Sequence, residues 1–261
     1  MMGRVIIMGS GELAPGLVAT HRFGIEAAGA NEVVILDTPF GFQENASQLT
    51  ERLVDFFDTS LTIGSRVAEL RHRNAPAADQ ARFVAAIRNA RYVFSGPGSP
   101  SYALDIWREA GVGQALRSMV QAGGTVTFAS AASLTLGRRA IPVYEIYKVG
   151  ESPRWLNGLD VMTDLGLPCV VVPHWNNAEG GNHDTSRCYI GERRLALLER
   201  ELDVGIIGVD EHTAALFDFG TGICEVSGRG TMTLRGESRQ VVESGSSLEI
   251  DQVAKILGVP N

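Results

Sequence analysis

Short apolar segments alternate along the chain with longer stretches of helical periodicity. The apolar runs lie at 5–8, 32–37, 67–70, 92–94 and 124–128, and many of them end in glycine or another turn-forming residue. Helix-like stretches follow the second and third runs, at about 45–57 and 75–88. Near-continuous apolar strands joined by crossover helices are typical of a parallel sheet covered on both faces. The pattern therefore predicts a three-layer, doubly wound α/β fold.

The pattern changes after about residue 203 to short apolar runs at close spacing. These runs lie at 204–207, 214–217, 223–226 and 231–234, and glycine-containing turns separate them. Such spacing predicts antiparallel β-hairpins at the edge of the sheet, closed by a short helix near 251–257. No linker-like stretch interrupts the chain, so we expect a single domain over 1–261.

Composition narrows the class of protein. The chain is 44% hydrophobic and 20% charged, with a formal net charge of −7, which suits a globular protein and offers no basic surface to nucleic acid. The apolar run at the N-terminus is too short for a signal peptide or a membrane span. Three separated cysteines indicate neither a disulfide framework nor a thiolate zinc site. We therefore expect a cytoplasmic protein without membrane or nucleic-acid partners.

Ser130 lies where a strand is expected to turn into a helix. In doubly wound sheets ligands bind beyond the carboxyl ends of the strands, and the glycine-rich loops at 9–12 and 95–99 are expected there too. A serine at such a turn, between small residues, is typical of a nucleophile elbow. Phe128 and Ala132 stand where the elbow signature has glycine, and a plain helix N-cap serine is the alternative interpretation.

A nucleophilic serine needs a base, and His174 is the best-placed candidate. It follows the apolar run 169–172, which brings it to the edge of the sheet where Ser130 is expected. Several carboxylates could orient the imidazole. Glu145 is flanked by aromatic and apolar residues, which favours a buried role, and an exposed place on a short helix is the alternative.

Together these segments resemble peptidase family S51, the α-aspartyl dipeptidases (peptidase E) and cyanophycinases, which have the class I glutamine amidotransferase-like fold. The likeness rests on the first glycine loop, a segment similar to "FxGGNQ", a nucleophile turn similar to "SAGA…G", a segment similar to "NPHFTNA…GH…TR…R" and an ending similar to "G(I/V)DE.TA" and "V.G.G". In this chain these are residues 9–12, 92–99, 130–137, 173–193, 209–214 and 225–230.

The resemblance implies a Ser130 nucleophile and a His174 base. The family's acid lies about fifteen residues past the nucleophile in the dipeptidases, which points to Glu145. The backbone N–H of Ala131, with that of Gly96 or Gly98, would form the oxyanion hole, because Pro97 has no N–H. The implied activity is a serine-type exopeptidase of the dipeptidase or cyanophycinase kind, without cofactor or metal.

The resemblance also implies a small peptide or amide substrate with an aspartyl group, and it allows a homodimer. A bidentate arginine would suit an aspartyl carboxylate. The candidate substrate-binding residues are Arg138, Arg139, Asn176, His183 and Arg187. Two alternatives remain open. One is a non-catalytic binding protein of the same fold, and the other is a zinc site formed by Glu179, His183, Asp184 and Cys188.

Overall fold

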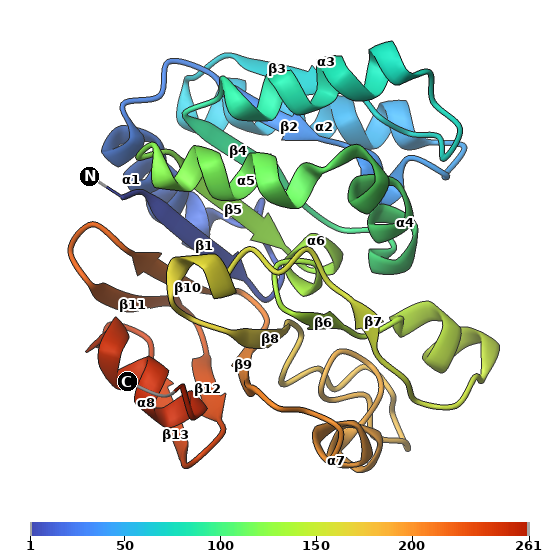
Figure 1. The fold of residues 1–261 in the computed structure, drawn as a ribbon, viewed down its shortest axis with the longest axis vertical. Helices are drawn as coiled ribbons and strands as arrows, with labels where there is room; N and C mark the ends of the chain where they lie inside the picture. The colour runs from blue at the N-terminus through green and yellow to red at the C-terminus, as the bar shows by residue number, and fades with distance from the viewer. Residues whose placement is uncertain (1, 260–261) are drawn as a thin grey trace.

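A computed structural model describes residues 2–259, so both ends of the expected domain 1–261 lie outside it. The described residues contain an eight-stranded sheet of order β14-β11-β10-β1-β5-β4-β2-β3, a four-stranded sheet of order β13-β12-β9-β8, and the ribbon β6-β7 (Figure 1). Adjacent strands among β1 to β5 of the large sheet are parallel. These strands are β1 (Arg4–Met8), β2 (Val33–Leu36), β3 (Ser65–Ala68), β4 (Tyr92–Ser95) and β5 (Thr125–Ala129).

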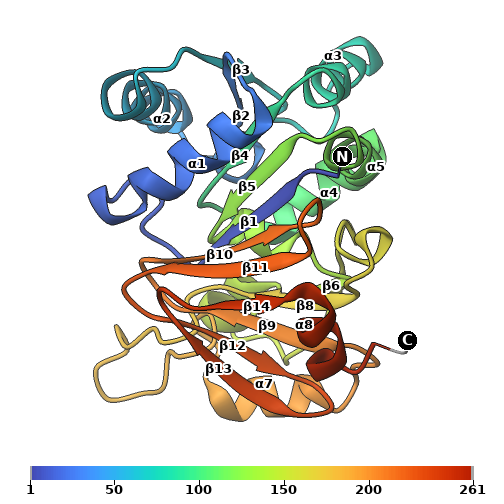
Figure 2. The same ribbon diagram turned by 90° about the vertical axis from the view of Figure 1, so that its left-hand side faces the viewer.

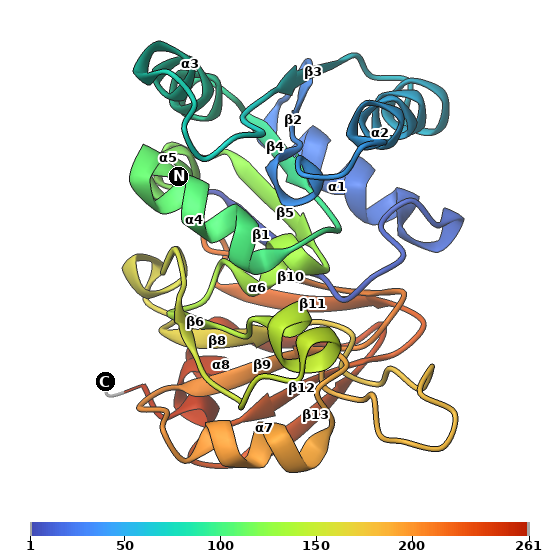
Figure 3. The same cartoon turned by 90° about the vertical axis from the view of Figure 1, so that its right-hand side faces the viewer.

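Helices cover both faces of this parallel region (Figures 2 and 3). One face carries α1 (Val18–Ala28) and α2 (Ala46–Leu61), and the other carries α3 (Ala77–Arg88), α4 (Pro100–Ala110) and α5 (Val112–Gln121). Successive residues of β1 point to opposite faces, so Val5 and Ile7 pack in one core and Ile6 and Met8 in the other. The prediction of a doubly wound sheet is confirmed, and two-sided burial explains why the runs in β1 and β2 are continuously apolar.

The C-terminal strands are antiparallel, as predicted, but they divide between two sheets. In the large sheet these are β10 (Thr213–Asp218), β11 (Ile223–Gly228) and β14 (Ser247–Glu249). The second sheet holds β8 (Cys169–Val172), β9 (Gly205–Val209), β12 (Thr231–Arg235) and β13 (Arg239–Glu243). In this sheet β12 is antiparallel to β9 and β13, but β8 and β9 pair in parallel. The remaining elements are α6 (Ala131–Leu134), β6 (Arg139–Ala140), β7 (Leu156–Asn157), α7 (Glu192–Glu199) and α8 (Ile250–Leu257).

The two sheets meet at the carboxyl end of β1. The backbone N–H of Ser130, after β5, donates to the Met8 carbonyl at 3.1 Å, and that of His174, after β8, donates to the Gly9 carbonyl at 3.3 Å. A Cβ atom on Gly9 would lie 2.0 Å from the carbonyl oxygen of Asp210, so this approach requires glycine. The end of β1 thus brings residues of two different sheets together. None of the described helices has the length and apolar character needed to cross a membrane.

Candidate active site

Ser130 occupies a strained turn between β5 and α6. Its backbone angles, φ 50° and ψ −123°, lie where residues with a side chain rarely occur, at a cost of about 1–3 kcal/mol. The turn forms although the two signature glycines are absent. Phe128 packs against Trp107, with ring centroids 5.7 Å apart, and so points into the helix-covered core. Ala132 is buried, and its N–H donates to the Gly96 carbonyl at 3.2 Å.

Ser130, His174 and Glu211 form a continuous hydrogen-bonded chain. The Ser130 Oγ lies 2.9 Å from His174 Nε2, and His174 Nδ1 lies 2.7 Å from Glu211 Oε1. Two asparagines hold Glu211 in place, one through its carboxylate and one through its backbone. Asn177 Nδ2 donates to Glu211 Oε1 at 2.9 Å, and the Glu211 backbone N–H donates to Asn176 Oδ1 at 2.8 Å.

The charge of Glu211 decides the direction of these hydrogen bonds. Burial by itself would raise the pKa of Glu211, but the hydrogen bonds from His174 and Asn177 outweigh it and hold the pKa below its ordinary value. An ionised carboxylate only accepts, so the His174 Nδ1–H donates to it. In the neutral imidazole Nε2 is then free to accept the Ser130 hydroxyl proton.

The expected partner of His174, Glu145, is not the carboxylate that the structure brings to the imidazole. Glu145 begins a π-helical turn, Glu145–Val149, and its Oε2 is buried without a hydrogen-bond partner among the described residues. Glu211 comes from the turn between β9 and β10, whose strands belong to different sheets. The sequence signal that could have found Glu211 is its place just after a buried strand, β9. Ser130 and His174 were predicted from the same kind of position.

Gly98 and Ala131 line the cavity beside Ser130, and Gly96 does not. Neither the Gly98 N–H nor the Ala131 N–H has a hydrogen-bond partner within residues 2–259. Gly98 has φ 137°, and a Cβ there would lie 2.1 Å from the Pro39 carbonyl oxygen, so only glycine fits. Of the three expected oxyanion residues, these two are therefore the ones with N–H groups available at the cavity.

The expected substrate-binding residues have other partners. Arg138 pairs with Asp203 at 3.0 Å, and Arg139 donates to Asn157. His183 stacks on Tyr147 with ring centroids 6.3 Å apart, and Asn176 supports Glu211. None of the five expected residues lines the described cavity.

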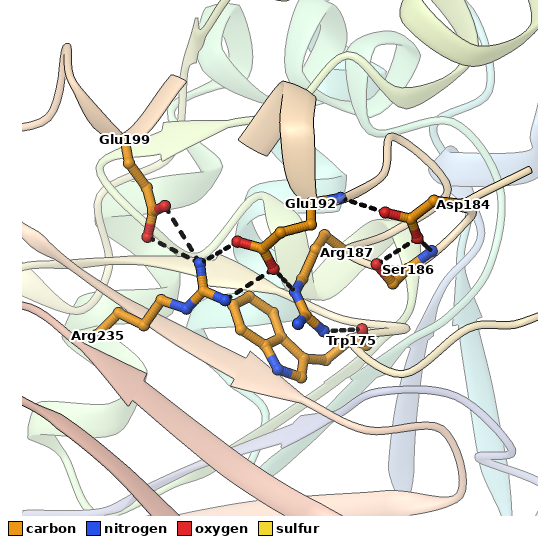
Figure 4. Close-up of polar contacts among 7 residues, drawn as sticks. All are labelled: Trp175, Asp184, Ser186, Arg187, Glu192, Glu199 and Arg235. Carbon is orange, nitrogen blue, oxygen red and sulfur yellow. Dashed lines mark hydrogen bonds and ion pairs between the residues drawn. The ribbon is translucent and has the colours of Figure 1, made fainter. Parts of the chain in front are cut away.

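Arg187, the fifth of them, belongs to an ionic cluster around Trp175, the residue after His174 (Figure 4). Its Nε donates to Glu192 at 2.7 Å, its Nη1 donates to the Trp175 carbonyl at 2.7 Å, and its guanidinium lies 4.1 Å from the Trp175 ring centroid. Arg235 lies 4.6 Å from the same ring and binds Glu192 and Glu199. The hydrogen bonds from Arg235 and Arg187 lower the pKa of Glu192 to about 2.

The ionic cluster borders a left-handed segment that contacts His174. Arg187, Cys188 and Tyr189 all have positive φ, at 58°, 58° and 69°. Three such residues in a row are costly without glycine, so surrounding contacts must hold them. The Arg187 N–H donates to Trp175 and the Cys188 N–H donates to His174. The Tyr189 ring then lies 5.2 Å from the His174 ring.

A different kind of contact holds the first glycine loop. His21 is fully buried, its Nε2–H donates to the Glu12 carbonyl, and its Nδ1 accepts from the Tyr92 hydroxyl, both at 2.8 Å. Burial lowers the pKa of His21 to about 4, so the ring is neutral at pH 7. Burial also raises the pKa of Glu12, although His174 and His212 oppose this. In the part of the chain that is described, no three His, Cys, Asp or Glu side chains form a group that could hold a metal ion.

The fold is shared with solved structures of peptidases. A peptidase from an acI-B1 Actinobacterium matches with a TM-score of 0.77 and 22% identity, over 95% of this chain and 97% of that one. A "Putative Peptidase E Protein" from Listeria monocytogenes EGD-e matches with a TM-score of 0.59 and 12% identity, over 88% and 100%. No protein-family model matches the chain, and no curated protein does. At these identities the likeness establishes the fold.

Proposed function

We propose that this protein is a serine hydrolase of peptide or amide bonds. One observation carries the proposal. Ser130, at a strained turn on the edge of the sheet, is hydrogen-bonded to His174, which is hydrogen-bonded in turn to Glu211. That arrangement is the one in which a serine hydroxyl becomes a nucleophile. The peptidase structures that share the fold favour a peptide or amide as the substrate.

The proposed reaction proceeds through an acyl-enzyme. His174 Nε2 takes the Ser130 proton as Oγ bonds to the substrate carbonyl carbon, and Glu211 stabilises the imidazolium. The N–H groups of Ala131 and Gly98 donate to the oxyanion. His174 then protonates the amine as the C–N bond breaks. Water, deprotonated by His174, attacks the ester carbonyl, and His174 returns the proton to Ser130 Oγ as the acid is released. The resemblance to peptidase E and the cyanophycinases extends this proposal to an exopeptidase of small peptides.

A serine variant tests the proposed nucleophile. Ser130→Ala should lower kcat/KM by a factor on the order of 10⁴ or more while leaving the circular dichroism spectrum intact, because the nucleophile is lost and the fold is not. Labelling by a fluorophosphonate should disappear with it. A wild-type protein that is folded but never labels at Ser130 would sink the proposal.

Glu211→Gln and Glu145→Gln form a matched pair for the third residue. We expect Glu211→Gln to lower kcat by about a hundredfold or more, because an amide neither fixes the imidazole tautomer nor stabilises its charge. Glu145→Gln should keep the wild-type rate, since Glu145 does not contact His174. The opposite ranking of the two variants would return the acid to Glu145.

A further inference from the structure

The cavity that opens on Ser130 has mostly apolar walls. Its volume is about 400 Å³, which is room for an amino-acid side chain and part of its backbone. The larger uncharged side chains in its lining are Leu134, Val143, Tyr144, Tyr147, Cys188 and Tyr189. Val143 and Cys188 are buried, and burial raises the pKa of the Cys188 thiol, so this thiol is neutral and adds no charge. A substrate group that enters here exchanges water for carbon and aromatic surfaces.

Aromatic rings in the cavity lining contact one another and the His174 ring. Tyr189 contacts the His174 ring, and Tyr147 lies 5.5 Å from Tyr189 between ring centroids. Tyr147 and Tyr144 are positioned by the π-helical turn and the residue before it, and π-helical turns are frequent at functional sites. The segment after β6 and the left-handed segment after His174 together form this wall. The wall is therefore part of the same structure that positions the imidazole.

No guanidinium lines this cavity among residues 2–259. The charged side chains in its lining are Lys148 and Glu179, both exposed, together with His174 if protonated. Lys148 Nζ lies 4.6 Å from the Tyr147 ring centroid, on the solvent side of the aromatic wall. Arg187, which the resemblance offered for an aspartyl carboxylate, is held by Glu192 and Trp175. A buried carboxylate would lose its hydration here without a bidentate partner.

We propose that the Ser130 site takes amides whose acyl side chain is apolar or aromatic, like that of leucine or phenylalanine, in preference to an aspartyl group. This inference rests on the proposed function and narrows its substrate. The apolar side chain lies against Tyr147 and Leu134 while its carbonyl carbon faces Ser130. Transfer of such a side chain from water is favourable enough to change kcat/KM by about tenfold or more over a substrate that lacks it.

Aminoalkylphosphonate diphenyl esters test this without turnover. Ser130 Oγ bonds to phosphorus, phenoxide leaves, and His174 takes the serine proton, so the mass of the full chain reports the reaction. We compare benzyl, isobutyl, methyl and carboxymethyl side chains on the same reagent. The benzyl or isobutyl reagent should label at least about tenfold faster than the carboxymethyl one. Equal or faster labelling by the carboxymethyl reagent overturns the inference.

Variants assign the preference to the wall. Tyr147→Ala should slow labelling by the benzyl reagent several-fold and leave the methyl reagent unaffected, because only the larger group reaches that ring. Phe42→Ala removes an exposed aromatic residue outside the cavity and should change neither rate. Faster carboxymethyl labelling that Lys148→Met abolishes would assign acidic recognition to Lys148 and overturn the inference. A protein labelled by a simple fluorophosphonate but by no member of the series also overturns it, whereas failure with every reagent sinks the proposed function itself.

Discussion

The two loops that flank Ser130 and His174 are held by different chemistry. The first glycine loop rests on His21 and Tyr92, a neutral pair sealed among the rings of Phe56, Phe57 and Phe94. The loop after His174 rests on the ionic cluster of Arg187, Glu192 and Arg235 around the buried Trp175 (Figure 4). The Glu192 side chain of this cluster is partly exposed to water. A neutral buried pair must stay uncharged to survive, and an ion pair must stay charged, so the two loops should fail under different conditions.

The largest expected effect is a loss of stability in acid, caused by protonation of His21 in the neutral pair that holds the first glycine loop. Burial lowers the pKa of His21 from the ordinary 6.5 to about 4 in the folded protein. Between these two pH values the unfolded chain therefore binds a proton at His21 that the folded protein does not bind. The contribution of His21 to stability is complete above pH 6.5 and is lost as the pH falls, by on the order of 3 kcal/mol at pH 4. Urea unfolding between pH 7 and pH 4 measures this. His21→Gln, although less stable at pH 7, should lack this part of the slope, and an unchanged slope would contradict the prediction.

The next effect is a loss of stability at neutral pH when the ionic cluster that holds the loop after His174 loses Arg187. Arg187→Met removes the ion pair to Glu192 and the hydrogen bond to Trp175 that help to hold the left-handed segment. We expect the free energy of unfolding to fall by about 2 kcal/mol, and kcat to fall with it because His174 is held less firmly. Arg193 is an exposed arginine that follows Glu192 at the start of α7, so Arg193→Met serves as the control. It should change the free energy of unfolding by less than about 0.5 kcal/mol. Equal losses in the two variants would remove the special role of Arg187.

The smallest effect is the pH dependence of the Glu192 ion pairs, which occurs at lower pH than that of His21. Pairing lowers the pKa of Glu192 from the ordinary 4.5 to about 2, so its stabilisation is complete above pH 4.5 and is lost as the pH falls toward 2. The stability difference between wild type and Glu192→Gln should therefore be constant from pH 7 to pH 5 and then shrink. Because the Glu192 side chain is 43% exposed, solvent screens this difference, and added salt should reduce it. A difference that persists at pH 2 would show that packing, and not charge, holds this loop.

Much of the fold could be predicted from the sequence because buried positions carry apolar residues. The apolar runs of β1 and β2 are continuous, since helices cover both faces of their sheet. Strand β13 was missed because it lies at the edge of the second sheet and is mostly exposed, so only Val242 among its residues is buried. The division of the C-terminal strands between two sheets was missed as well. Local patterns carry no information about which distant strand is the neighbour.

The candidate site divides along the same line. Ser130 and His174 could be paired from the sequence because each follows a buried strand, and ligands bind beyond the carboxyl ends of such strands. The two strands, β5 and β8, lie in different sheets, and the residues meet because both sheets join at the end of β1. The acid could not be chosen by spacing, because Glu145 and Glu211 are both carboxylates in suitable surroundings, and only the approach of the β9–β10 turn to β8 distinguishes them. Arg187 could not be assigned either, since a guanidinium that suits a substrate carboxylate suits Glu192 equally well.

Residue types along the chain thus determined the buried strands, some of the helices and the strand ends where chemistry can occur. Those properties depend on hydrophobic periodicity and on turn-forming residues, which act over a few positions. Which carboxylate meets the imidazole, and which arginine remains free for a ligand, was decided only when the two sheets joined at the end of β1. A hydrogen bond forms when two groups come within about 3 Å in the right direction. Such short distances between residues far apart in sequence arise only in the folded chain. There Glu211 accepts a hydrogen bond from His174, and Glu192 accepts one from Arg187.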